Sequence, residues 1–144
     1  MKTITLPGSR TKNHTEHTVP LTDKAVAILE AIPRRIGRDL VFGVGKGGFG
    51  AWTKAKLNLQ AKSKTEGWTP HDIRRTVRTG LGKLGVEPHV AEACLNHLPS
   101  RLIRTYDRNT YAAEKRAALD AWASHLSVVI AQATGANVTT LRKA

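Results

Sequence analysis

Residues 68–85, with the sequence WTPHDIRRTVRTGLGKLG, decide how the middle of the chain folds. Thr69 can cap a helix, Pro70 suits the first helical position, and Asp72 places a negative charge in the first turn. Gly85 supplies a left-handed stop. The stretch therefore predicts a helix from Pro70 to about residue 84, although the two glycines inside it weaken the prediction for its last turn.

The same helix start brings two basic side chains together. His71 and Arg74 are three residues apart, so they share a helix face. Both lie near a helix N-terminus, whose free N–H groups and dipole attract anions. The spacing favours a phosphate-holding site. The alternative is an exposed first turn on which these side chains, with Arg75 and Arg78 beside them, are only solvated charges.

The remaining patterns predict a mostly helical α+β fold with a small antiparallel sheet at its front. Alternating residues 2–6 indicate a strand, and residues 11–21 indicate an extended hairpin arm. Residues 98–111 look irregular or weakly helical, and the tail 134–144 is polar and expected to be flexible. Apolar spacing and capping residues predict further helices at about 22–32, at about 49–60, from Pro88, and at about 112–133.

The whole chain is strongly basic. Its 144 residues suit one domain, and a hydrophobic content of 40% is enough for a folded core. The formal net charge of +12 favours a nucleic-acid partner, because neutralised phosphates release counterions; a solubilising surface or an acidic protein partner is the alternative. One cysteine fits a reducing cytoplasm, and neither a membrane-length apolar run nor a secretory pattern occurs. We therefore expect a soluble, intracellular protein.

Two patterns in the sequence raise the question of a cofactor site. The glycine-rich loop at residues 43–50 follows a short apolar strand and formally matches a dinucleotide fingerprint, but no second strand with an acidic end follows it. Cys94 with His97, or His14 with His17, could be imagined as zinc ligands, yet structural zinc sites generally use several cysteines. We expect neither a nucleotide cofactor nor a metal.

The helices on either side of Gly85 also outline a helix-turn-helix DNA reader. A recognition helix normally presents polar side chains to base edges, whereas Ala91 and Cys94 suit that role poorly. Composition alone leaves this alternative open.

Four motifs occur in a suggestive order: Lys12 within Thr-Lys-Asn, then His71-Asp-Ile-Arg74-Arg75-Thr, then Leu95-Asn96-His97, and then Tyr106. With this order and spacing the chain, from about residue 4 to residue 130, resembles the phage integrase or tyrosine recombinase family. The segments 106–108 and 114–123 resemble the prophage and genomic-island integrases in particular. The resemblance implies a small sheet packed on a helical tyrosine-recombinase catalytic domain.

The resemblance also implies a site that cleaves and rejoins DNA. Tyr106 would be the nucleophile that forms a 3′-phosphotyrosyl bond, and Lys12 the general acid for the leaving 5′-oxygen. Arg74 would hold the non-bridging oxygens, while His71 and His97 would bind the phosphate or help to move the tyrosine proton. Because the covalent intermediate conserves the phosphodiester bond, neither metal nor ATP is needed. Further DNA contacts are expected from Arg75, Arg78, Arg101, Arg104 and Arg108.

Tyr111 is a second candidate for the nucleophile. Residue chemistry alone does not rank the two phenols, but the spacing from His97 favours Tyr106. The family pattern also contains an arginine upstream, in an Arg-x-Gly-Glu helix start that occurs nowhere in this chain. Losing one charge-stabilising donor costs about 2.7–4 kcal/mol. We therefore expect residues 1–133 to be a partial catalytic domain, the C-terminal part of an N-terminally truncated integrase.

The expected function is site-specific DNA recombination by a bacterial or phage-encoded, nucleoid-associated protein of the cytoplasm. Its expected partners are a double-stranded att-type DNA site and further copies of itself, since a strand at residues 2–6 without an upstream neighbour leaves an exposed edge. The alternatives are a DNA-binding module that does not cut and a helix-turn-helix regulator.

Overall fold

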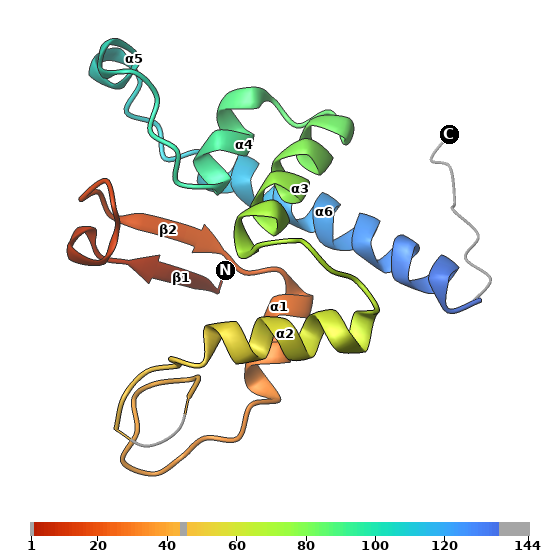
Figure 1. Ribbon diagram of the computed structural model, residues 1–144. Coiled ribbons are helices and arrows are strands. Elements are labelled where there is room, and N and C mark those ends of the chain that lie inside the picture. The colour runs from red at the N-terminus through yellow and green to blue at the C-terminus, as the bar shows by residue number, and fades with distance from the viewer. Residues whose placement is uncertain (1, 44–45, 136–144) are drawn as a thin grey trace.

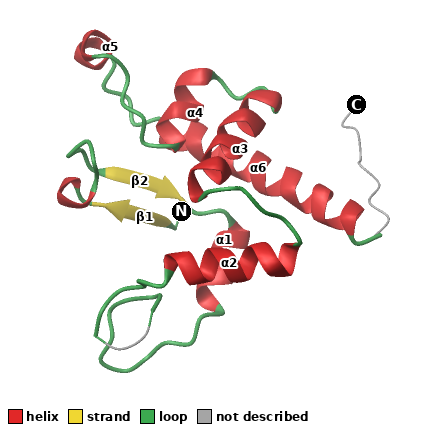
Figure 2. Cartoon of the chain, in the orientation of Figure 1, coloured by secondary structure: helices red, strands yellow, loops and turns green. Residues whose placement is uncertain are grey.

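The computed structural model describes residues 2–43 and 46–135 of the chain. Its fold is α+β and mostly helical, with a small antiparallel sheet at the N-terminus, which confirms the predicted fold class (Figure 1, Figure 2). Within these residues no helix is both long and apolar enough to cross a membrane. The elements are β1 (Thr3–Leu6), the 3-10 turn η1 (Gly8–Arg10), β2 (His17–Pro20), α1 (Asp23–Glu30), α2 (Trp52–Ser63), α3 (Pro70–Lys83), α4 (Pro88–Cys94), α5 (Arg101–Tyr106) and α6 (Ala112–Ala133).

β1 and β2 form a two-stranded antiparallel hairpin in which Leu6 lies opposite His17. The hydroxyls of Thr5 and Thr18 hydrogen-bond across the strands at 3.0 Å. The outer edge of β2 is covered by α6, from which the Nζ of Lys115 donates to the carbonyl oxygen of Thr18 at 2.9 Å. In the described part of the chain no strand lies beside the outer edge of β1. The sheet therefore has one covered edge and one open edge.

The core lies where α3, α4 and α6 meet. Leu81 of α3 and Ala91 of α4 are fully buried, and Val90, Cys94 and Ala118 complete the cluster. α4 is too short to be stable alone, so this burial is what holds it in place. The core thereby fixes α4 relative to the C-terminal half of α3. One sequence motif lies at the other end of α3, and another directly follows α4.

Trp122 of α6 packs across Gly80 of α3. A Cβ atom built on Gly80 would lie 2.1 Å from Cζ3 of the indole, which leaves no room for any side chain. The glycine that weakens the sequence prediction for this helix is therefore needed for helix packing. At Gly82 the nearest atom to an added Cβ would be a guanidinium nitrogen of Arg78 at 3.7 Å, an ordinary contact.

These two glycines make a matched test of the core. We expect Gly80→Ala to lower the free energy of unfolding by about 1–3 kcal/mol, because the indole of Trp122 must move out of its packed position. Gly82→Ala should leave stability unchanged or raise it by up to about 1 kcal/mol, since alanine is the better helix former. Urea denaturation measures both, and equal effects at the two positions would contradict the packing described here.

The segment between α1 and α2 is irregular and lies on the far side of the sheet from α5 (Figure 1). Residues 40–42 are exposed and form no strand, so the strand predicted before the glycine-rich loop is wrong. The guanidinium of Arg38 organises this loop by donating to the carbonyl oxygens of Leu40 and Phe42 at 3.1 and 2.8 Å. Residues 44–45 of the glycine-rich loop and residues 136–144 of the predicted tail lie outside the described residues.

Candidate active site

The first turn of α3 is fixed by Asp72. Its carboxylate accepts hydrogen bonds from the backbone N–H of Thr69 at 2.9 Å and from the Thr69 hydroxyl at 2.7 Å. These two bonds are the main reason that the pKa of Asp72 lies below its ordinary value. In the same part of α3, His71 is exposed and Arg74 is half-buried. The predicted helix start is confirmed.

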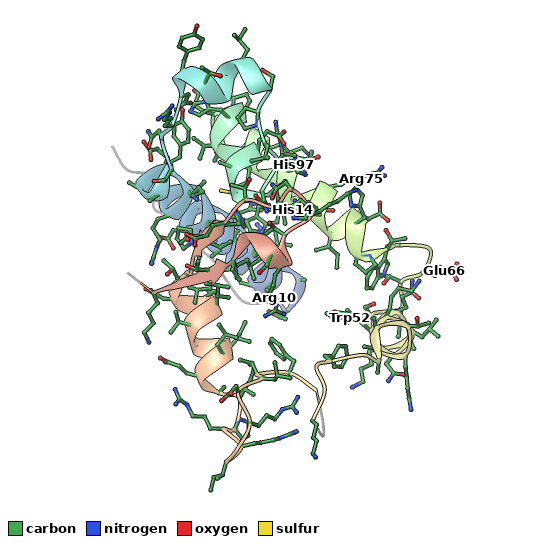
Figure 3. The ribbon with its side chains drawn as sticks, turned by 90° about the vertical axis from the view of Figure 1, so that its left-hand side faces the viewer. Arg10, His14, Trp52, Glu66, Arg75 and His97 are labelled. Atoms are coloured by element: carbon green, nitrogen blue, oxygen red, sulfur yellow. The ribbon has the colours of Figure 1, made fainter. Side chains whose placement is uncertain are left out.

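The turn of the β1–β2 hairpin docks on the end of α4. The side-chain amide of Asn13 donates to the backbone carbonyl oxygen of Asn96 at 3.2 Å and to its side-chain oxygen at 3.0 Å, across 83 positions of sequence. We call this contact the asparagine clasp. Lys12 precedes Asn13, and His97 follows Asn96. The clasp therefore brings Lys12 and His97 to one edge of the molecule. Figure 3 shows His14 and His97 in this same region.

Asn96 has the backbone conformation that the clasp requires. Its φ is +56°, in the left-handed region that asparagine adopts more readily than most residues. His14, at the other side of the contact, has φ +55°. The chain therefore turns sharply on both sides of the clasp, and the two turns present Lys12 and His97 to solvent.

Beneath the hairpin lies His17, which sequence reasoning considered only as a zinc ligand. Its ring is buried and donates a hydrogen bond to the backbone carbonyl oxygen of Cys94. Burial lowers the pKa of His17 most, and the positive charges of Lys115 and then Arg74 lower it further. The imidazole is therefore neutral near pH 7. The charges of Lys115 on α6 and of Arg74 on α3 thus both act on the His17 ring in β2.

The burial of His17 predicts a stability that depends on pH. An unfolded histidine has a pKa near 6.5, and the folded pKa is lower, so the unfolded state binds more protons as the pH falls. We expect the free energy of unfolding to be highest above pH 6.5 and to decline as the pH falls through 6.5 towards the folded pKa. Urea denaturation across this window should show a smaller decline for His17→Gln, whereas His14→Asn, at an exposed position, should keep the decline of the parent chain.

At the end of α4, Glu92 contacts two of the basic residues named above. Its Oε2 pairs with Nδ1 of His97, and its Oε1 accepts a hydrogen bond from Nε of Arg78 at 2.6 Å. The bond from Arg78 first, and that from His97 second, lower the pKa of Glu92 below its ordinary value. The sequence gives no signal for Glu92, because a glutamate at this position is typical of the solvated face of an amphipathic helix.

The two phenols have different environments. The hydroxyl of Tyr111 donates to the carboxylate of Asp107, which raises the pKa of Tyr111, and its ring packs against His89 with centroids 4.8 Å apart. Tyr106 ends α5 with 83% of its surface exposed, on an arm that stands away from the rest of the molecule (Figure 1). Among the described residues no hydrogen bond or ring contact joins the Tyr106 phenol to Lys12, Arg74 or His97.

Comparison with known proteins fits this arrangement. The model of the phage integrase family matches residues 1–113, which is most of the chain. The chain belongs to the phage integrase family. Prophage integrase IntA of Escherichia coli K12 is 32% identical to it over 122 residues, which cover 82% of this chain and 30% of that relative. The chain thus spans under a third of the length of the curated integrase that it matches, and no solved structure matches it significantly.

The sequence also raised a zinc site and a helix-turn-helix reader as alternatives. The described residues contain no group of three or more histidine, cysteine, aspartate or glutamate side chains that could hold a metal ion. Cys94 is buried, and burial raises the pKa of its thiol. On α4, Val90, Ala91 and Cys94 face the core, so these three side chains are not available to read a DNA groove.

The arginines predicted to contact DNA in this integrase-family chain differ in their surroundings. Arg75 is exposed and lies 3.4 Å from Asp72 through Nη1, and Arg108 is exposed. Arg78 is only about one third exposed, because Glu92 holds its guanidinium. The side chains of Arg101 and Arg104 lie outside the described part of the structure. Arg75 and Arg108 are therefore the clearer candidates for phosphate contacts.

Proposed function

We propose that this chain acts in site-specific DNA recombination and cleaves one strand by forming a 3′-phosphotyrosyl bond to Tyr106. The observation that carries the proposal is the asparagine clasp, which joins the lysine hairpin to the end of α4 above a buried histidine whose pKa the positive charge of Arg74 helps to lower. We infer that lysine, arginine and imidazole groups from three separate segments, namely the hairpin, α3 and the end of α4, bind one phosphate.

The chemistry assigns one role to each group. The phenol oxygen of Tyr106 attacks phosphorus as its proton leaves, and the bond from phosphorus to the 5′-oxygen breaks. Arg74 holds two non-bridging oxygens with its planar guanidinium group. These hydrogen bonds become stronger as negative charge develops on the oxygens. Lys12 donates a proton to the departing 5′-oxygen. His71 supplies a further hydrogen bond at the start of α3, where the helix dipole also favours the anion.

The position of Tyr106 makes cleavage depend on movement of α5. This helix is joined to the rest of the chain by irregular segments at 95–100 and 107–111, and it has few contacts with other elements in the described structure. Below it lies a hollow of about 610 Å³ lined by His97, Asn96, Ile103 and Tyr111 among others. We propose that bound duplex DNA draws α5 towards the clasp and brings the phenol to the phosphate.

Family membership supports a proposal for the partners and the location. We propose a double-stranded att-type DNA site as the substrate, self-association on that DNA with the open edge of β1 as one contributor, and a place on the nucleoid in the cytoplasm. The 144 residues contain no Arg-x-Gly-Glu motif, and we propose that they lack one donor to the phosphate. We propose that cleavage by this chain is slower for that reason, by about two to three decades.

A suicide duplex, nicked so that the released strand diffuses away, tests the proposal. The chain should yield a denaturation-resistant protein–DNA adduct, and mass spectrometry of its peptides should place the modified residue at Tyr106. Salt-sensitive binding to the duplex with no adduct after prolonged incubation would instead establish a DNA-binding module that does not cut. An adduct at Tyr111 would refute the assignment of the nucleophile.

A further inference from the structure

Glu92 lies between a guanidinium and an imidazole. Nε of Arg78 donates to its Oε1 at 2.6 Å, and Nδ1 of His97 pairs with its Oε2. The backbone N–H of His97 also donates to the carbonyl oxygen of Glu92 at 3.0 Å. Both the main chain and the side chain of Glu92 therefore hold His97, and the histidine ring has one defined orientation at the edge of the hollow beneath α5.

This arrangement fixes where the imidazole proton sits. A guanidinium can only donate hydrogen bonds, and an ionised carboxylate can only accept them. Glu92 is kept ionised by its two partners, so the nitrogen that faces it must carry a proton. In neutral His97 the proton is then on Nδ1, and Nε2 is left with a free lone pair.

We infer that Glu92 is a positioning residue that fixes His97 as the Nδ1–H tautomer and so makes its Nε2 a proton acceptor. This role rests on the proposed function: at the scissile phosphate, Nε2 would take the phenol proton of Tyr106 as the oxygen–phosphorus bond forms. The O–H bond breaks, an Nε2–H bond forms, and the adjacent carboxylate stabilises the resulting imidazolium. His97 is thereby assigned to the tyrosine proton rather than to donation towards the phosphate.

Arg78 allows a sharp test of the inference. Its guanidinium determines which atom of the side-chain amide faces His97 when position 92 is a glutamine. In Glu92→Gln the amide has one acceptor and one donor group. Arg78 can use only the acceptor, so the amide NH₂ must face His97. Nδ1 then has to accept, and the proton moves to Nε2. An isosteric change of one atom is thus expected to invert the tautomer of His97.

Removing the guanidinium should reverse this inversion. In the double variant Glu92→Gln with Arg78→Met, the amide can rotate and offer its oxygen to His97, which restores the proton to Nδ1. A residue that merely supports the fold would not produce an inversion and a restoration of this kind. His71, exposed on α3, serves as the control whose tautomer should stay the same in all three proteins.

Long-range ¹H–¹⁵N correlation spectra of the DNA-free chain, with labelled histidine at about pH 8 where imidazoles are neutral, read the tautomer directly. The His97 signals are assigned by their loss in His97→Gln. We expect protonated Nδ1 in the parent chain, protonated Nε2 in Glu92→Gln, and protonated Nδ1 again in the double variant. An Nε2–H tautomer in the parent chain would overturn the inference without reference to any variant, and an unchanged spectrum in Glu92→Gln would also overturn it.

The adduct assay separates this inference from the proposed function. Glu92→Gln should slow adduct formation by about 10²–10⁴-fold, the usual contribution of a positioned base, while duplex retention stays the same. If the tautomer inverts but adduct formation keeps its parent rate, the role of His97 as the base is refuted. If the parent chain forms no adduct, the proposed function fails while the tautomer result still decides the role of Glu92.

Discussion

Tyr106→Phe is expected to abolish covalent attachment to DNA while leaving duplex binding intact. The substitution removes only the hydroxyl, and with 83% of the tyrosine surface exposed no buried contact is lost. The adduct should therefore disappear below detection on a suicide duplex, and electrophoretic retardation of the same duplex should be unchanged. An unchanged free energy of unfolding would show that the loss is chemical.

Tyr111→Phe provides the matched control. It removes a hydroxyl that donates to the carboxylate of Asp107, at the start of α6. We expect this variant to retain the adduct and to lose about 0.5–1.5 kcal/mol of stability, the net value of one hydrogen bond. The reverse pattern, with the adduct lost in Tyr111→Phe and retained in Tyr106→Phe, would move the nucleophile to the packed phenol.

Arg74→Ala is expected to slow adduct formation by about 10²–10³-fold, the cost of removing one fixed donor from a developing oxyanion. Arg74 is half-buried on α3, and its positive charge is among those that lower the pKa of His17. Arg74→Lys should recover only part of the rate, because an ammonium group cannot form the planar fork. Single-turnover kinetics at saturating DNA give these rates.

Arg75→Ala is the control for the loss of one positive charge from the same helix. This neighbour is exposed and pairs only loosely with Asp72, so it is suited to a DNA phosphate and not to the reacting one. We expect weaker binding and a shallower dependence of affinity on salt, with the rate at saturation preserved. If the two alanine variants behaved alike, Arg74 would be no more than one basic residue among many.

The sequence predicts well those parts of the fold that depend on neighbouring residues. The start of α3 follows from Thr69, Pro70 and Asp72, and its end follows from Gly85, whose φ is +77°. α6 extends over the predicted residues 112–133. In each case the capping and helix-forming signals lie within a few positions of the element that they define.

Contacts between distant segments could not be predicted in this way. Local rules mark Gly80 as a weakness of α3, whereas the structure shows that Trp122 occupies the space beside it. Nothing near Asn13 in sequence indicates that it reaches Asn96. His17 lies in a strand whose alternation gives no sign of the lysine and arginine charges near its ring.

For the candidate site, sequence spacing predicted the groups, and the structure shows partners for some of them, such as His97. The motif order was enough to single out His97 and Tyr106, and family membership confirms the resemblance on which their roles were based. Spacing could not reveal that Glu92 joins His97 to Arg78, because that contact depends on how α3 packs against α4. Nor could it place α5 on an arm away from the other motifs.

The asparagine clasp has a consequence for how this protein can fail. Asn13 and Asn96 are outside the buried cluster, so loosening their contact would leave the core packed and the basic surface unchanged. Such a molecule would purify normally, unfold cooperatively on heating and bind a DNA duplex. Under the proposed mechanism, however, Lys12 would lie on a loosened hairpin turn, and the bond to the unprotonated 5′-oxygen would break slowly. The stability of the fold and the geometry of the candidate site therefore depend on different contacts in this chain.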